Sequence, residues 1–390
     1  MIKSKNYSKV RLLISLYLNY FVHGFGLVIL SQNMGILGEK WNVSLKMVSF
    51  LMSGIGLGRL VSYPVMGRIA TIINKKTFLY IGMISYSIFA VGVISVNNFI
   101  GIYLCIFFAG IANSALDAGT YPMLVEMSTG EGEKTIIIKI FMSLGEFFLP
   151  LIVTFLVTNK LWFGWSFVIM VALLMLNIIN VASIRIPRIQ ENKVEITVQN
   201  VEKKKIISTV LLLIYGYTSM AMMIWFTQWI TIFAKQFLRL TEEMSHMLLS
   251  LYSLGSIMGV VVLYCVLQRY KHIHSLLVLI NMIPIGALAV ILCSENILVI
   301  AIACLLFGGS AASGVMQLGL VIFMKIYPKH RSLVTSAFYF FGSIASFTIP
   351  IITGILFENG ILSVFIGLLL LGVIGLCLVS VLAMKSKEMG

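Results

Sequence analysis

Twelve runs of apolar residues, separated by short charged or turn-forming segments, constrain this chain more than any other feature. Each run is long enough to cross the hydrocarbon core of a bilayer, which takes about 20 helical residues. The pattern therefore predicts an all-α polytopic membrane protein with twelve transmembrane helices. The runs cover residues 12–30, 47–69, 78–96, 102–125, 135–157, 163–184, 207–232, 244–267, 276–292, 297–326, 334–357 and 361–384.

The composition excludes a soluble globular protein. Apolar residues make up 59% of the chain and charged residues only 11%, whereas a water-facing surface needs roughly 25–35% charged residues. A net charge of +14 in a soluble protein would suggest a nucleic-acid partner. Here most of the cations lie between the runs or near their ends, so we expect a lipid bilayer and no nucleic acid as the surroundings of this chain.

The placement of the cations predicts the orientation in the membrane. If the N-terminus is cytoplasmic, 22 of the 28 lysines and arginines lie on the cytoplasmic side, five lie opposite, and Arg59 lies inside a run. Cytoplasmic loops are the ones that carry excess lysine and arginine. Both termini are therefore expected to be cytoplasmic, and the number of spans is expected to be even.

The two halves of the chain resemble each other. Gly110 in the fourth run and Gly309 in the tenth both begin a stretch of small residues, 199 positions apart, and the fifth and eleventh runs each carry a glycine followed by a proline. We expect a six-helix half over residues 1–184, a cytoplasmic linker over 185–206 and a second six-helix half over 207–390. Inverted or repeated halves of this kind predict a substrate site between them, near the midplane.

The loop after the second run resembles a motif of the major facilitator superfamily. That motif is a glycine followed by Asp-Arg-x-Gly-Arg-Arg, and this chain reads GRIATIINKK over residues 67–76. Gly67 and the basic pair Lys75 and Lys76 match, Thr71 replaces the acidic residue, and Asn74 is expected to take the left-handed conformation that glycine usually supplies. The resemblance implies the twelve-helix fold of that family.

Four further segments are similar to bacterial inner-membrane transporters of the YdiM/YdiN type. They read YLNYFVHG at 17–24, GLGRL at 56–60, NSALDAGTYP at 113–122 and LWFGWS at 161–166. This resemblance implies a multi-pass transporter of the bacterial cytoplasmic membrane and leaves its substrate open.

Four ionisable residues lie deep inside the runs of the first half. They are His23, Arg59, Asp117 and Glu146. A charge at bilayer depth is costly unless it is paired or hydrated, which makes each a functional candidate. At 1.5 Å per residue, Arg59 is about 15 Å from the cytoplasmic end of its run and the others are at similar depth. Arg59 needs an anion: either Asp117, in a structural ion pair, or a substrate carboxylate held at two points.

Asp117 and Glu146 are the candidate proton-coupling residues, because a buried carboxyl can take up and release a proton. The alternative is that each makes a polar contact between helices. His23 is also a candidate for proton coupling. The alternative is that it is a neutral hydrogen-bonding group. At the cytoplasmic side we expect Glu126 to pair with Lys75 or Lys76 as a gate, and Lys139 either to join that gate or to reach the membrane surface.

Polar and aromatic residues in the middle of other runs complete the predicted site. An aromatic residue at this depth is as readily a packing residue as a ligand. With His23 and Arg59, the candidate substrate-binding residues are Asn19, Asn113, Trp225, Gln228, Gln317 and Tyr339.

These residues favour a secondary transporter, coupled to protons, that takes up a small organic anion or a related polar metabolite. An exporter of drugs or metabolites is the alternative, and a transport-inactive sensor is a third. The drug/proton antiporters of the superfamily often carry Gly-Pro-x-x-Gly-Gly in the fifth run, and this chain does not. No nucleophile elbow, phosphate loop or metal-ligand spacing occurs in the sequence. We therefore expect no enzyme activity, no metal and no cofactor, and a protein that acts as a monomer.

Overall fold

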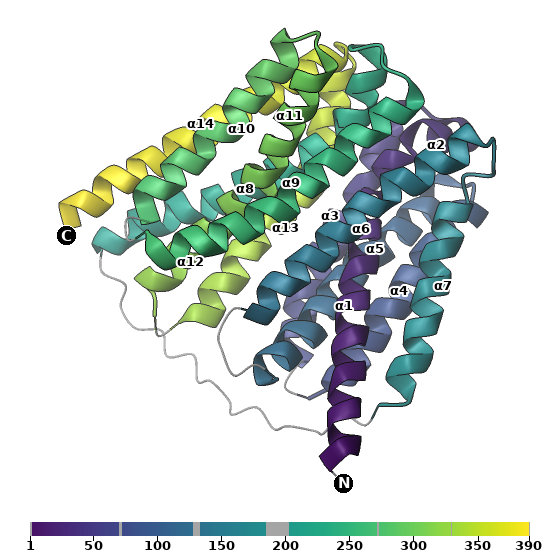
Figure 1. Ribbon diagram of the computed structural model, residues 1–390, viewed down its shortest axis with the longest axis horizontal. Helices are drawn as coiled ribbons and strands as arrows, with labels where there is room; N and C mark the ends of the chain where they lie inside the picture. The colour runs from purple at the N-terminus through teal and green to yellow at the C-terminus, as the bar shows by residue number, and fades with distance from the viewer. Residues whose placement is uncertain are drawn as a thin grey trace. The chain divides into compact units, whose positions relative to one another are not determined.

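The described residues form two compact units of helices (Figure 1). The structure is a computed structural model and describes residues 2–69, 72–127, 133–184, 203–270, 273–328 and 330–389. Within these ranges the regular elements are helices without strands, and twelve of the helices are long and apolar enough to cross a membrane. The prediction of an all-α protein with twelve spans is therefore confirmed.

The first unit, Met1–Ile196, contains six spans and one short helix that the hydropathy pattern did not reveal. The short helix α2 lies between the first two spans, where the polar loop was expected. The elements are α1 (Ile2–Gln32), α2 (Met34–Trp41), α3 (Leu45–Ile69), α4 (Lys75–Ser95), α5 (Phe99–Glu126), α6 (Glu133–Thr158) and α7 (Trp165–Ala182).

The second unit, Thr197–Gly390, contains the other six spans. Helix α8 begins at Lys203, so the last residues assigned to the linker at 185–206 are helical, while 185–202 lie outside the described residues. The tenth span is interrupted by a wider π-helical segment, η1. The elements are α8 (Lys203–Gln236), α9 (Glu242–Arg269), α10 (Ile273–Cys293), α11 (Ile297–Phe307), η1 (Gly308–Val315), α12 (Met316–Ile326), α13 (Arg331–Phe357) and α14 (Ile361–Met389).

Glycines bring the second and fourth spans of the first unit into backbone contact. A Cβ atom at Gly58 of α3 would collide with the carbonyl oxygen of Phe107 on α5, and one at Gly110 of α5 would lie 2.6 Å from the amide nitrogen of Arg59. Lipid chains are as apolar as the helices, so the hydrophobic effect does not drive helices together in a membrane. Close backbone packing through small residues contributes much of the free energy of association instead. Arg59 is consequently held directly against α5.

The second unit repeats this crossing between its own second and fourth spans. Gly255 and Gly259 of α9 face Leu305 and Gly309, and a Cβ atom on either glycine would collide with the backbone there. Gly309 and Gly110, which the sequence pairs at an offset of 199 residues, therefore occupy the same kind of helix crossing in the two units. In the second unit this crossing includes η1, whose wider turn begins at Gly308.

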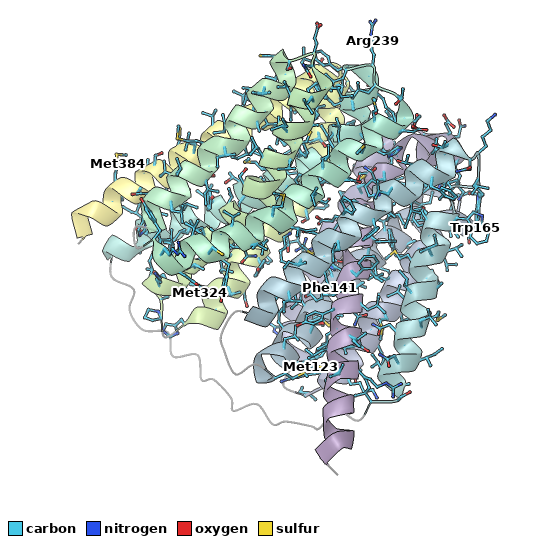
Figure 2. The ribbon with its side chains drawn as sticks, viewed as in Figure 1. Met123, Phe141, Trp165, Arg239, Met324 and Met384 are labelled. Atoms are coloured by element: carbon cyan, nitrogen blue, oxygen red, sulfur yellow. The ribbon has the colours of Figure 1, made fainter. Side chains whose placement is uncertain are left out.

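A third glycine contact fixes α1 against α6. A Cβ atom at Gly24 would collide with the Met142 carbonyl oxygen, and one at Gly145 would collide with the Phe21 carbonyl oxygen. One residue before Met142, the ring of Phe141 (labelled in Figure 2) stacks on Tyr17 of α1 at 5.0 Å between centroids. The crossing places Glu146, the next residue after Gly145, beside α1.

The turn before α4 differs from the prediction for Asn74. Its backbone is extended (φ −65°, ψ 136°), and its side-chain oxygen accepts a hydrogen bond from the Lys76 amide at 3.1 Å. The prediction of a left-handed Asn74 is therefore wrong. An asparagine at this position caps the first turn of a helix, which requires an extended backbone.

Candidate functional site

The strongest candidate site lies in the interior of the first unit, where α1, α3 and α5 contribute a chain of hydrogen bonds. Arg59 Nη2 donates to the Tyr63 hydroxyl at 3.4 Å, and Tyr63 donates to Asp117 Oδ2 at 2.6 Å. The hydroxyl of Tyr20 donates to the other oxygen, Oδ1, of the same carboxylate. Two of the predicted residues, Arg59 and Asp117, are therefore connected through a tyrosine that the prediction did not include.

Arg59 is deeply placed and is also held by an aromatic ring. Its side chain is 8% exposed, and its guanidinium carbon lies 5.6 Å from the centroid of the Tyr63 ring. A cation over an aromatic face gains electrostatic stabilisation, more so when water is excluded. Tyr63 thus contacts Arg59 with both its ring and its hydroxyl, because the two residues are four apart on α3 and share a face.

A second hydrogen-bonded group adjoins the first and includes His23 and Asn113. The hydroxyl of Tyr86 on α4 donates to Asn113 Oδ1 and lies 3.0 Å from His23 Nδ1. All three side chains are buried. The His23 ring lies 5.5 Å from the Tyr20 ring, centroid to centroid, which links the two groups. The structure therefore gathers His23, Arg59, Asn113 and Asp117 into one cluster.

Glu146 and Lys139 form a separate pair on α6. Glu146 is 3% exposed and Lys139 is half-buried. The two side chains interact electrostatically, and Lys139 is also within electrostatic range of His23 on α1. Seven residues, two helical turns, separate the pair, so both project from one face of α6.

Asn19 contacts a neighbouring helix. Its Oδ1 accepts a hydrogen bond from Asn177 Nδ2 of α7 at 2.8 Å, and Asn177 also donates to the Ser15 carbonyl at 2.9 Å. One turn further along, Asn180 donates to the Ser15 hydroxyl at 2.6 Å. Asn19 thus belongs to a polar contact that fixes α1 against α7, and we do not retain it among the substrate ligands.

Among the predicted gate residues, Lys76 contacts the backbone of a neighbouring helix. Its amine donates to the Ala182 and Ile184 carbonyl oxygens at 3.3 and 2.8 Å, at the C-terminus of α7. Unpaired carbonyls at a helix C-terminus attract cations. The Glu126 side chain lies outside the described residues, and Lys75 lies in the first turn of α4. Lys76 therefore fastens α4 to α7, while the pairing of Glu126 with Lys75 or Lys76 stays a prediction.

The predicted residues of the second unit lie on three different elements. Trp225 of α8 donates its indole N–H to the Val364 carbonyl of α14 at 2.9 Å, so its single donor is used in packing. Gln228 is buried on α8, whereas Gln317 of α12 and Tyr339 of α13 are half-buried. We retain these last three as candidates and leave Trp225 out.

Three tyrosines of the cluster, Tyr20, Tyr63 and Tyr86, were not predicted. For two of them a signal was present: Tyr63 follows Arg59 by four residues and Tyr20 precedes His23 by three, so each shares a helix face with a predicted residue. Tyr86 is on α4, and no spacing in the sequence connects it with α1 or α5.

Twelve helices apolar enough to span a membrane, six in each unit, define a multi-pass membrane protein. The chain belongs to the Major Facilitator Superfamily, whose family model matches residues 16–293. Proteins of this family are transporters and are not enzymes.

Two curated relatives and one solved structure agree with this assignment. The chain is 33% identical over 380 residues to the inner membrane transport protein YdiM of Escherichia coli (strain K12), covering 96% of this chain and 94% of YdiM. It is 29% identical over 353 residues to the inner membrane transport protein YdiN of the same organism, covering 89% and 83%. A D-xylose-proton symporter shares the fold, with a TM-score of 0.74 at 10% identity, over 95% of this chain and 97% of the symporter.

Proposed function

We propose that this protein is a proton-coupled secondary transporter that takes up a small organic anion or a related polar metabolite. The observation that carries the proposal is the chain of contacts from Arg59 through Tyr63 to Asp117 in the interior of the first unit. A guanidinium keeps its charge under all physiological conditions and matches a carboxylate at two points. A substrate carboxylate is the anion that suits such a group.

The surroundings of Arg59 support an anion of modest size with a polar body. Tyr63 and Tyr86 offer hydroxyl groups beside it, while His23 and Asn113 contribute ring and amide groups in the adjoining hydrogen-bonded group. These residues bind a hydroxylated or carbonyl-bearing molecule better than a hydrocarbon. In the second unit, described by itself, Gln228, Gln317 and Tyr339 stay our proposed substrate-binding residues.

Proton coupling is proposed because two carboxyl side chains, Asp117 and Glu146, lie within the spans of the first unit. A carboxyl group at this depth has to be balanced or neutralised, and reversible neutralisation is a means of moving a proton. The name of the D-xylose-proton symporter, whose fold this chain shares, supports this part of the proposal.

We further propose that both termini face the cytoplasm of the bacterial cell and that one chain suffices for transport, the two units serving as its two halves. The orientation is supported by the excess of lysine and arginine on the predicted cytoplasmic side. In this orientation Lys75 and Lys76 at the start of α4 lie at the cytoplasmic ends of the spans. There they would stabilise one of the two states of a gate.

The proposal is tested with purified protein, first by ligand stabilisation and then by uptake into proteoliposomes. Thermal unfolding in the presence of carboxylates, neutral sugars and cationic drugs should show stabilisation by members of the first class. Arg59→Lys should weaken the binding free energy of that ligand by roughly 1.5–3 kcal/mol, the usual value of a hydrogen bond to a charged group. The matched control, Arg68→Lys at the exposed end of the same helix, should leave affinity unchanged.

Two results would overturn the proposal. Stabilisation by cationic drugs and not by any carboxylate would favour the efflux alternative. Unchanged affinity for a carboxylate in a folded Arg59→Lys protein would remove Arg59 from the binding site, and with it the reason for an anionic substrate.

A further inference from the structure

Among the described residues of the first unit, two carboxyl groups within the spans have different surroundings: Asp117 is half-buried and Glu146 is buried. Both oxygens of Asp117 accept hydrogen bonds, Oδ1 from Tyr20 and Oδ2 from Tyr63. The oxygen of Tyr63 itself accepts from Arg59, so the Tyr63 proton is directed at Asp117. A carboxyl group that only accepts is an ionised one, since the protonated form must donate from one oxygen.

A proton on Asp117 would disrupt this arrangement. The hydroxyl facing the protonated oxygen would have to turn away, and Tyr63 cannot turn without competing with the N–H of Arg59 that it already accepts. The negative charge that balances Arg59 across Tyr63 would also be lost. Leaving the buried Arg59 cation without its balancing anion is strongly unfavourable. The local structure therefore keeps Asp117 ionised.

Glu146 has the opposite surroundings. It is 3% exposed, and its Oε2 finds no hydrogen-bond donor among the residues that the structure describes. A carboxylate oxygen that is both dehydrated and without a donor is costly, whereas a neutral carboxyl group avoids most of that cost. The charge acting on Glu146 is that of Lys139, two turns earlier on the same helix.

Other titratable groups on the neighbouring helices are engaged elsewhere. On α1, Tyr17 stacks on Phe141, while Tyr20 and His23 contact α5 and α4. On α5, Asp117 is bound by its two tyrosines. Helix α7 contains no acidic, basic, tyrosine or cysteine residue between Trp165 and Ala182. The remaining titratable residues of α5 with described side chains are Tyr103, which is hydrogen-bonded with Ser53, Tyr121, which lies edge-on to Tyr20, and Cys105.

We infer that the two carboxyl groups have separate tasks. Asp117 stays ionised and positions Arg59 through Tyr63. Glu146 binds one proton at one membrane face and releases it to water at the other. While Glu146 is deprotonated, the Lys139 ammonium balances the charge of its carboxylate. The transport role of Glu146 rests on the proton coupling proposed above. The difference in protonation between the two groups does not depend on it.

The protonation states can be measured in the unmodified protein because Asp117 is the only aspartate in the chain. Aspartate labelled with carbon-13 at its side-chain carboxyl therefore reports on Asp117 alone in an infrared spectrum of the purified protein. The absorption of protonated carboxyl groups at neutral pH should be unaffected by labelled aspartate and should shift with labelled glutamate. A shift caused by labelled aspartate would overturn the assignment.

Variants then assign the glutamate signal to one residue. Glu146→Gln should remove the band of the protonated carboxyl, and the matched control Glu295→Gln, at an exposed position, should retain it. If Glu146→Gln fails to fold, Glu146→Asp replaces it: the band should then respond to labelled aspartate, because a second aspartate now exists. A band that persists unchanged in a folded Glu146→Gln protein would refute the role of Glu146.

Transport measurements separate this inference from the proposed function. Glu146→Gln should exchange substrate across the membrane at close to the unmodified rate and should lose all accumulation driven by a pH gradient, because exchange requires no net proton release. If the unmodified protein shows no gradient-driven accumulation, proton coupling is wrong and the carrier role of Glu146 with it, while the infrared result stands. If both proteins accumulate substrate equally, coupling is right and Glu146 is not the carrier.

Discussion

The link between Arg59 and Asp117 through Tyr63 predicts a specific pattern of stability in a double-mutant cycle. Arg59→Ala leaves Asp117 with its two phenolic donors but without a balancing cation. Removing one partner of a buried charge pair lowers the free energy of unfolding by about 3–5 kcal/mol. Because Asp117 keeps its two hydrogen-bond donors, we expect a loss of about 3 kcal/mol for Arg59→Ala. Asp117→Ala leaves the cation of Arg59 buried, at 8% exposure, and takes the acceptor from two hydroxyls. Its cost should therefore lie near the upper end, about 5 kcal/mol.

The double variant Arg59→Ala/Asp117→Ala should lose less stability than the sum of the losses in the two single variants. Neither charge then remains buried alone, so we expect a coupling free energy of about 2–3 kcal/mol, at the high end for residues in one network. The assay is equilibrium unfolding of the purified protein in mixed micelles. A matched cycle on Lys235 and Glu242, an ion pair whose side chains are 28% and 52% exposed, should give about 1 kcal/mol or less.

The hydroxyl of Tyr63 should carry part of that coupling. In a Tyr63→Phe background the coupling between Arg59 and Asp117 should fall, since the connecting donor and acceptor is gone. Tyr20→Phe, which removes a donor to the same carboxylate but does not touch Arg59, should leave the coupling intact. Additive losses in the original cycle, within about 0.5 kcal/mol, would refute the argument that the three side chains act as a unit.

Two further predictions concern packing and orientation. Gly58→Ala should destabilise the protein by about 1–3 kcal/mol, because its Cβ atom would collide with the Phe107 carbonyl, whereas Gly67→Ala on the same helix meets open space and should be neutral or slightly stabilising in the same unfolding assay. In a protein whose native cysteines are replaced by serine, single cysteines within residues 194–199 should react with a membrane-impermeant reagent only from the cytoplasm, and a cysteine at Lys160 only from outside. Reaction of both from one side would contradict the proposed orientation.

Hydropathy alone was sufficient to predict the fold class, because in a bilayer each span must be apolar along its own length and must satisfy its own backbone hydrogen bonds. The charges inside the spans were equally visible, since Arg59, Asp117 and Glu146 interrupt runs in which a charge is costly. Local signals of a finer kind were less reliable. Asn74 was expected to be left-handed and instead caps α4, because an asparagine side chain can satisfy a turn in either way.

Which charges are partners was decided only by the tertiary structure. A tyrosine within a span is ordinary. The spacing of Tyr63 from Arg59 and of Tyr20 from His23 indicates a shared helix face, but it does not show that either hydroxyl reaches Asp117. The tyrosine hydroxyls become a site because the glycine crossings at Gly58 and Gly24 bring α3 against α5 and α1 against α6. Hydrogen bonds reach only about 3 Å, so the contacts between helices, rather than residue types, determine that Asp117 is surrounded by donors and that Oε2 of Glu146 has none among the described residues.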